Sequence, residues 1–252
     1  MDLSDSVRRQ FGAAADDYAR SGVHSAGPDL DAMLAAAGDV EGRSVLDIGA
    51  GTGHTALAFA ARGASVVALD LTPEMLARAD EAATQRGLRI ETRVGAAERL
   101  PFDDASFDLA VCRVCAHHFA DVAASAREAR RVLAPGGAYL LVDSVSPPSP
   151  LVDTFLNAIE VIRDPSHVRD YTVGQWAETF VRAGLRFELL GQHAYRIDFD
   201  DWIARMHTPE LAASQIRAMF ALAPSEVRTT LRIADDDAFD IPSALMRGTR
   251  AD

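Results

Sequence analysis

The sequence contains no lysine, and its 25 basic residues, all arginine, are outnumbered by 37 acidic ones. The formal net charge is −12 at pH 7, and no sustained run of arginines interrupts the acidic balance. Proteins that gain affinity by neutralising phosphates usually carry a basic patch, so this balance argues against a nucleic-acid substrate. A local basic face gathered by folding is the alternative that stays open.

Cysteines and long apolar runs are also scarce. Cys112 and Cys115 are the two cysteines of the chain, too few for a disulfide framework. No stretch approaches the roughly 20 apolar residues that cross a bilayer, and no basic region followed by an apolar run opens the chain as in a secretory signal. We therefore expect a cytoplasmic protein without a membrane span. Its 48% hydrophobic and 25% charged residues are those of an ordinary globular protein.

Short apolar runs alternate with helical segments in the middle of the chain. Strands are expected at residues 44–48, 65–69, 88–94, 107–112 and 138–143, and helices at 54–62, 73–86 and 121–133. Pro73 suits the first turn of its helix, with Thr72 as the expected cap. Such alternation predicts a parallel, doubly wound α/β sheet with helices on both faces.

The two flanks are less clearly patterned. Val7, Phe11 and Tyr18 fall at helical spacing in the first 40 residues. After Ser144 the pattern predicts helices at 151–162, 173–183 and 200–222, the last interrupted near Pro209, and strands at 186–190 and 238–246.

Three features follow the ends of neighbouring predicted strands: the glycine loop 49–53, Asp70 and the segment that begins with Arg113. In an open parallel sheet, ligands bind at the carboxyl ends of the strands. Glycines let a ligand approach the backbone closely, and an acidic residue after the second strand can accept both hydroxyls of a ribose. The alternative is an ordinary turn with an incidental aspartate.

A dinucleotide fold competes for the same pattern. Its fingerprint G-x-G-x-x-G/A requires glycine or alanine at position 54, where this chain has His54. The run Val45-Leu46-Asp47-Ile48-Gly49-Ala50-Gly51-Thr52-Gly53 resembles instead the first motif of class I S-adenosylmethionine-dependent methyltransferases. The resemblance implies that the loop approaches the methionyl part of the cofactor.

The resemblance continues along residues 5–145 and is strongest for the branch of ubiquinone and menaquinone C-methyltransferases. The runs 69–76, 95–102 and 131–137 are similar to later motifs of the family. They imply that Asp70 holds the ribose and that Met75 packs on the adenine. The implied cofactor-binding residues are Tyr18, Asp47, Gly49, Ala50, Gly51, Gly53, Asp70, Leu71, Met75, Ala96, Ala97, Glu98, Arg113 and His118.

Ala96 departs from the pattern of the family. The family commonly has aspartate at this position, so the bond to the adenine amino group must come from the backbone or from Glu98. Phe11 and Tyr18 match an N-terminal helix that often closes over the cofactor in that branch, and core packing is the alternative for both.

His117 and His118 follow the fourth strand, where such enzymes place groups near the transferred methyl. Histidine is the usual base near neutral pH, so either residue is a candidate catalytic base. The alternative is that one packs beneath the cofactor and the other orients the loop.

Several other residues have open roles. Cys112 and Cys115 form C-x-x-C without a second pair, which predicts buried thiols and no metal site. Residues 164–167 form either part of a substrate wall or a surface turn. Glu160, Tyr171 and Trp176 either line a pocket or belong to the core or surface.

The resemblance implies a single domain (1–252) with a Rossmann-like seven-stranded sheet, mostly parallel with an antiparallel last strand, and a helical cap. We divide it into an N-terminal helical lid (1–40), a cofactor-binding core (41–145), a cap and substrate region (146–235) and a final strand and tail (236–252). The expected reaction transfers a methyl group from S-adenosylmethionine to a small molecule, a quinone precursor or natural product, and releases S-adenosylhomocysteine. The rivals are a non-methylating S-adenosylmethionine-binding protein and a nucleotide-dependent oxidoreductase. The oligomeric state is not predicted.

Overall fold

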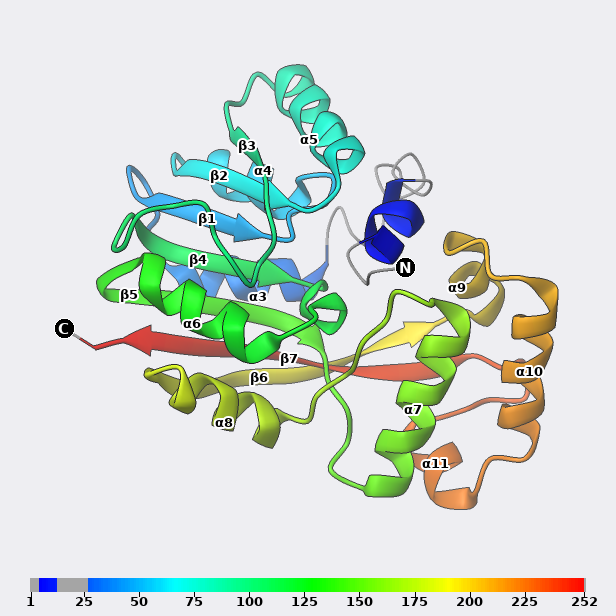
Figure 1. Cartoon of the computed structure of the whole chain (residues 1–252). Helices are drawn as coiled ribbons and strands as arrows, with labels where there is room; N and C mark the ends of the chain where they lie inside the picture. Colours follow the sequence, from blue (N-terminus) through cyan, green and yellow to red (C-terminus); the bar gives the residue numbers. More distant parts are fainter. Residues whose placement is uncertain (1–4, 13–26, 252) are drawn as a thin grey trace.

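The computed structural model describes residues 5–12 and 27–251, which form a seven-stranded sheet with helices around it (Figure 1). The strands are β1 (Ser44–Ile48), β2 (Ser65–Asp70), β3 (Glu91–Val94), β4 (Phe107–Arg113), β5 (Leu133–Ser144), β6 (Leu185–Ile197) and β7 (Phe239–Arg250). The helices are α3 (Pro28–Ala37), α4 (His54–Ala60), α5 (Pro73–Gln85), η1 (Ala116–His118, a 3-10 turn), α6 (Val122–Val132), α7 (Pro150–Arg163), α8 (Val173–Arg182), α9 (Phe199–Arg205), α10 (Glu210–Ala221) and α11 (Ser225–Thr230). Residues 5–12 are also helical.

The strand order is β3-β2-β1-β4-β5-β7-β6, so the winding direction reverses between β1 and β4. The first five strands are parallel, and β7 runs antiparallel to both β5 and β6. The predicted doubly wound sheet with an antiparallel last strand is therefore confirmed. The reversal places the carboxyl ends of β1 and β4 side by side, which is where such sheets bind ligands.

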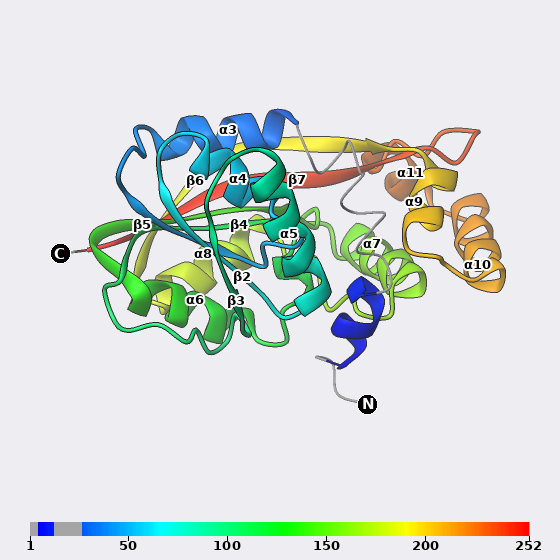
Figure 2. The same cartoon turned by 90° about the horizontal axis from the view of Figure 1, so that it is seen from above.

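Side chains alternate between the two faces of the sheet, and each face contributes to a separate hydrophobic core. Leu46 and Ile48 of β1 belong to one buried cluster, whereas Val45 belongs to the other. The first core lies under α6 and α8, and the second under α3 and α4, on opposite sides of the sheet (Figure 2). This period of two follows from the pleat of a strand buried on both faces.

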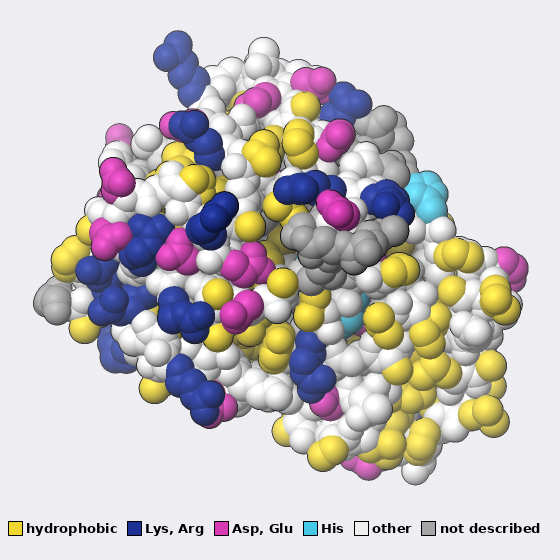
Figure 3. Space-filling view, viewed as in Figure 1, with side chains coloured by type: hydrophobic (Ala, Val, Ile, Leu, Met, Phe, Trp, Pro, Cys, Tyr) yellow, Lys and Arg dark blue, Asp and Glu magenta, His cyan; other side chains and the backbone are white. Residues whose placement is uncertain are grey.

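The long strands β6 and β7 extend past the parallel strands and carry a third core. There α7, α9, α10 and α11 gather around the strand ends (Figure 1), with Trp202, Phe220 and Phe239 fully buried between them. The region 146–235 is thus divided, because α8 packs against the main sheet and the other helices form the cap. Apolar side chains are frequent on the outer face of the cap (Figure 3), where Leu211 and Leu222 are exposed.

Thr72 is the N-cap residue of α5 and Pro73 begins the helix, as predicted, although the Thr72 side chain makes no capping hydrogen bond. Several predicted strand bounds were wrong. Strand β3 begins at Glu91 rather than at residue 88, and β6 continues to Ile197 rather than to residue 190. Beyond Gly191 the partly buried Tyr195 and the buried Ile197 alternate with the exposed Ala194 and Arg196, and the strand continues by pairing with β7 after a register shift. Among the described residues, no helix has the length and apolarity needed to cross a bilayer.

Candidate active site

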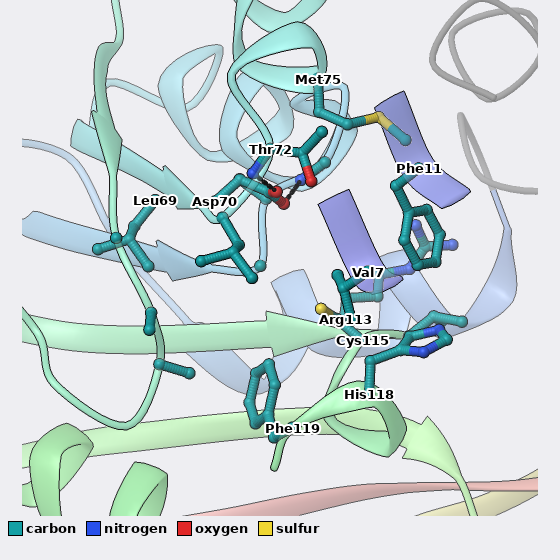
Figure 4. A pocket seen from close by; sticks show the side chains of 18 of the residues that line it. Val7, Phe11, Leu69, Asp70, Thr72, Met75, Arg113, Cys115, His118 and Phe119 are labelled. Carbon is teal, nitrogen blue, oxygen red and sulfur yellow. Dashed lines mark hydrogen bonds between the residues drawn. The ribbon is translucent and has the colours of Figure 1, made fainter. Parts of the chain in front are cut away.

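An open cavity lies at the carboxyl ends of β1, β2 and β4, with the helix of residues 5–12 at its mouth (Figure 4). Its volume is about 1060 Å³ with the mouth included. Arg8 Nε donates to the Leu71 carbonyl at 3.3 Å, and Gln10 Nε2 donates to the Met206 carbonyl at 2.9 Å. The N-terminal helix therefore joins the rim of the cavity to the cap.

The glycine loop forms one wall of this cavity with left-handed backbone geometry. Gly49, Gly51 and Gly53 have φ values of 72°, 53° and 83°. A Cβ at Gly49 would collide with the Cys115 side chain, and one at Gly53 would lie 2.7 Å from the Ala79 Cβ. A Cβ at Gly51 would meet nothing within 4 Å, because that position faces the cavity. The loop thus leaves room for a ligand at Gly51 and for the protein's own side chains at Gly49 and Gly53.

Asp70 is fixed at the end of β2 by two backbone amides. Its Oδ2 accepts from the Gly51 amide and its Oδ1 from the Thr72 amide, both at 2.8 Å (Figure 4). Each carboxylate oxygen has two lone pairs, so both can still accept a ligand hydroxyl. Burial raises the pKa of Asp70 above its ordinary value, although the backbone amides oppose this shift.

Asp47 lies beneath the loop and does not line the cavity itself. It is 1% exposed, and its Oδ2 has no hydrogen-bond partner in the described part of the chain. Burial, together with the nearby charge of Asp70, raises the pKa of Asp47 to about 7, although the Ala56 amide opposes this. Two carboxyl groups with raised pKa values favour a cationic ligand, because a positive charge would stabilise their ionised forms. A methionyl group with its ammonium and sulfonium fits this environment.

Met75, Ala96, Ala97 and Glu98 also line the cavity. Met75 is 2% exposed and reaches the cavity from the first turn of α5. Glu98 Oε1 accepts from the Ala120 amide at 2.8 Å, which ties it to the loop after η1. Glu98 therefore lines the expected adenine region while one of its oxygens holds the protein backbone.

Arg113 ends β4 with a buried ion pair. Its Nε donates to Asp29 Oδ2 at 2.5 Å, and both side chains are at most 5% exposed. Burial alone would raise the pKa of Asp29, but the Arg113 guanidinium outweighs burial and lowers this pKa below its ordinary value. This pair fixes α3 to the end of β4, and Val114 after it adopts a left-handed φ of 53°.

A second cavity of about 800 Å³, mouth included, adjoins the first. Both cavities are lined by Phe11, Arg113, Val114 and His118. The remaining walls of the second cavity come from η1, β5, α7, β6, α9 and β7, namely His117, Ser144, Glu160, Arg163, Asp164, Tyr195, Ile197, Trp202, Arg205 and Ile241. The second cavity thus lies between the sheet and the cap.

His117 is held by β5 and by the loop after α7. Its Nδ1 donates to Asp143 Oδ1 at 2.7 Å, and its carbonyl accepts from the amides of Val168 and Arg169. Burial opposes the charged ring, yet the carboxylates of Asp143, Asp170 and Glu160 raise the pKa of His117 to about 9. His117 is therefore an imidazolium at neutral pH.

His118 has the opposite character. Its Nδ1 lies 3.1 Å from the Ser166 carbonyl, and its Nε2 lies 4.0 Å from Asp164 Oδ2. Burial and the positive charge of His117 lower its pKa well below the ordinary value, so the ring is neutral. The rings of the two histidines are 4.2 Å apart, and Phe11 packs edge-on against His118 at 4.8 Å.

The structure brings most of the predicted cofactor residues to the first cavity. Gly49, Ala50, Gly51, Asp70, Leu71, Met75, Ala96, Ala97, Glu98, Arg113 and His118 line it. Asp47 lies beneath the loop, and Gly53 ends the loop without lining the cavity. His117 lines only the second cavity, and Tyr18 lies outside the described residues.

Other residues with open roles are also placed. Glu160 and Asp164 line the second cavity, whereas His167, Tyr171 and Trp176 line neither. Cys112 is buried and Cys115 lines the first cavity. Burial raises the pKa of Cys112, and the neighbouring Cys112 together with burial raises that of Cys115, as expected for unreactive thiols.

Sequence reasoning missed the walls that β6, β7 and α9 contribute. Tyr195 and Trp202 are distant in sequence from Ile241, and the pairing of β6 with β7 places Tyr195 opposite Ile241, so no local motif marks these residues. Asp143 could have been recognised from the sequence, because it comes near the end of an apolar strand, which is the pattern that identified Asp70.

Comparison with known proteins agrees with this geometry. Residues 46–141 match the family model described as a methyltransferase domain. The chain is 39% identical to the uncharacterized methyltransferase YcgJ of Bacillus subtilis over 88% of each chain. It is 42% identical to the uncharacterized protein YafE of Escherichia coli over 69% of this chain and 85% of that one. Over 60% of this chain and 65% of the relative, it is 36% identical to demethylmenaquinone methyltransferase of Deinococcus radiodurans.

The crystal structure of YcgJ superposes with a TM-score of 0.86 at 36% identity, covering 89% of this chain and 98% of that one. The fold, the glycine loop at the end of β1 and the sequence similarity over most of the chain therefore all indicate the same family. The chain belongs to the class I S-adenosylmethionine-dependent methyltransferase family.

Proposed function

We propose that the protein binds S-adenosylmethionine in the first cavity and transfers its methyl group to a small molecule in the second. The observation that carries this proposal is the shared wall, in which Arg113 and His118 line both cavities. Two ligands that exchange a group must meet at reacting distance, and adjoining cavities allow this.

The charges of the first cavity support this cofactor over a dinucleotide. When bound, S-adenosylmethionine supplies an electrophilic methyl group on a cationic sulfonium. Asp47 and Asp70 favour a cation there. The pyrophosphate of a dinucleotide would place negative charge beside the same carboxyl groups. Gly51 leaves space for the ligand, and Asp70 is oriented to accept ribose hydroxyls.

The acceptor is proposed to be a small molecule because the second cavity lies between the sheet and the cap, is lined by side chains from several elements and adjoins the first cavity. Quinone precursors, which the demethylmenaquinone methyltransferase relative suggests by its name, and natural products of similar size are the classes to screen.

Calorimetry with S-adenosylmethionine, S-adenosylhomocysteine and NADH tests the cofactor. We expect binding of the first two and none of NADH. A homocysteine-release assay across quinols, phenols, amines and thiols then tests the transfer. Tight cofactor binding without product from any acceptor would favour the non-methylating alternative, and preferential binding of NADH would refute the proposal.

A further inference from the structure

The two histidines of η1 present opposite hydrogen-bonding atoms to the second cavity. A carbonyl oxygen only accepts, and the Ser166 hydroxyl, 3.4 Å from His118 Nδ1, donates its own proton to Asp164 at 2.7 Å. His118 therefore donates Nδ1–H to the Ser166 carbonyl, which leaves a lone pair on Nε2 of the neutral ring. His117 donates Nδ1–H to Asp143, and its charged ring carries a second proton on Nε2. In the described part of the chain that Nε2 has no hydrogen-bond partner. One imidazole therefore offers an acceptor and its neighbour a donor.

We propose that the methyl acceptor is a phenol-type hydroxyl compound, that His118 Nε2 takes its O–H proton, and that His117 Nε2–H holds the oxygen. This inference rests on the proposed methyl transfer and names the acceptor class of the same site.

The bonds and charges balance without a further reactant. The O–H bond of the acceptor breaks, and its proton moves to His118 Nε2. The electron pair left on oxygen forms the bond to the methyl carbon, while the pair of the broken carbon–sulfur bond stays on sulfur, which becomes a neutral thioether. The proton then leaves His118 for solvent, and the product is a methyl ether.

A hydroxyl oxygen of the acceptor fits the two histidines better than an amine nitrogen does. A hydroxyl oxygen that attacks with one lone pair keeps others, so it can accept from His117 at the same time. An amine nitrogen has a single lone pair, which is consumed in the attack, and the resulting ammonium would face the His117 imidazolium. An anion that develops on oxygen is stabilised by the same charge.

The charged groups around His117 and His118 keep the first ring protonated and the second ring neutral. His117 faces Asp143 of β5, Glu160 of α7, and Asp170 of the loop after α7. His118 faces His117, Arg163 and His167, which oppose its protonation, and Asp164 at 4.0 Å from Nε2. A proton that arrives on that nitrogen would lie beside the Asp164 carboxylate. Phe11 covers the remaining side of the ring without charge.

The rest of the cavity suits an aromatic body. Ile197, Trp202 and Ile241 provide apolar surface from three different elements, and Phe11 closes the side shared with the first cavity. Arg163 lies over the Trp202 ring at 4.7 Å and holds it in place. A flat ring carrying a hydroxyl can pack on these side chains while its oxygen reaches the histidines.

Two asparagine variants separate the roles. Asparagine can keep the amide donor that each ring provides through Nδ1, to Ser166 at 118 and to Asp143 at 117, but it has no group in place of Nε2. At saturating S-adenosylmethionine, we expect His118→Asn to slow methyl transfer to unsubstituted 1-naphthol by about 100-fold or more. His117→Asn should slow it by about 100-fold. His207→Asn is the control, because that exposed side chain lines neither cavity and asparagine tolerates the left-handed φ of 50° at this position.

A second acceptor makes the base assignment specific. A nitrophenol that is already ionised at the assay pH needs no base, so His118→Asn should transfer methyl to it nearly as fast as the unsubstituted protein does. His117→Asn should remain slow with both acceptors. Equal loss on both acceptors in His118→Asn would overturn the base role.

NMR of the imidazole nitrogens provides a readout that requires no turnover. We expect His118 as the neutral Nδ1–H tautomer and His117 as the doubly protonated ring at neutral pH. An Nε2–H tautomer for His118, or a neutral His117, would overturn the inference. So would methylation of 1-naphthylamine but not 1-naphthol, a carbon-methylated product, or no transfer to any hydroxyl compound while cofactor binds. Failure to bind S-adenosylmethionine would instead refute the proposed function.

Discussion

Replacing Gly51 by alanine is expected to separate the folding role of the glycine loop from its binding role. Gly51 has a left-handed φ of 53°, and a Cβ there meets nothing within 4 Å. The cost to folding is therefore backbone strain alone, about 1–2 kcal/mol. The added methyl group would project into the first cavity, so we expect at least a tenfold loss of S-adenosylmethionine affinity, or about 1.4 kcal/mol.

Gly87 supplies the matched control. It follows α5 with a φ of 65°, a Cβ there also meets nothing within 4 Å, and it does not line either cavity. Gly87→Ala should therefore lose the same stability in urea denaturation and bind the cofactor normally in calorimetry. Gly49→Ala should lose more, by about 1–3 kcal/mol, because its Cβ would overlap Cys115. Unchanged affinity in Gly51→Ala, with the same stability as Gly87→Ala, would show that the loop does not hold the cofactor.

Three further changes test other parts of the two cavities. Asp70→Asn leaves only one oxygen for the Gly51 and Thr72 amides, so we expect a loss of about 1–3 kcal/mol in urea denaturation and weaker cofactor binding in calorimetry. Ala96→Asp should keep or tighten cofactor binding, and a large loss in calorimetry would show that the adenine lies elsewhere. The pKa of His117 rises from 6.5 to about 9 on folding because the carboxylates of Asp143, Asp170 and Glu160 outweigh burial, so its stabilising effect is complete below pH 6.5 and is lost as pH rises through 9. Urea denaturation should show a fall on the order of 1–3 kcal/mol across that range, and a smaller fall in His117→Asn.

The glycine loop and Asp70 in the wall of the first cavity could be predicted from sequence because each of them is encoded locally. The run that forms β1 ends directly in the glycine loop, and the run that forms β2 ends in Asp70. Parallel pairing of β1 with β2 then brings the two strand ends together without further information. The positions of the loop and of Asp70 therefore followed from hydrophobic pattern and topology alone.

The walls of the second cavity could not be predicted because long-range strand pairing brings their residues together. Tyr195 lies opposite Ile241 only because β6 and β7 pair in a register that shifts near Gly191. The apolar pattern of β6 is interrupted there by Gly191 and Gln192, and the alternation resumes only with Tyr195 and Ile197. The difference between His117 and His118 is likewise set by Asp143 and Ser166, which lie on other elements.

The two cavities differ in charge in a way that suits transfer between unlike ligands. In the first, Asp47 and Asp70 have carboxyl groups that a cation would stabilise. In the second, burial also raises the pKa of Glu160, to about 7, but this carboxyl group already has a cationic partner in Arg163 at 3.6 Å. Asp164 accepts from the Ser166 amide. The His117 imidazolium there favours an oxygen anion. A cationic methyl donor and an anionic acceptor would each be bound where its own charge is favoured, and they would meet at the wall that both cavities share.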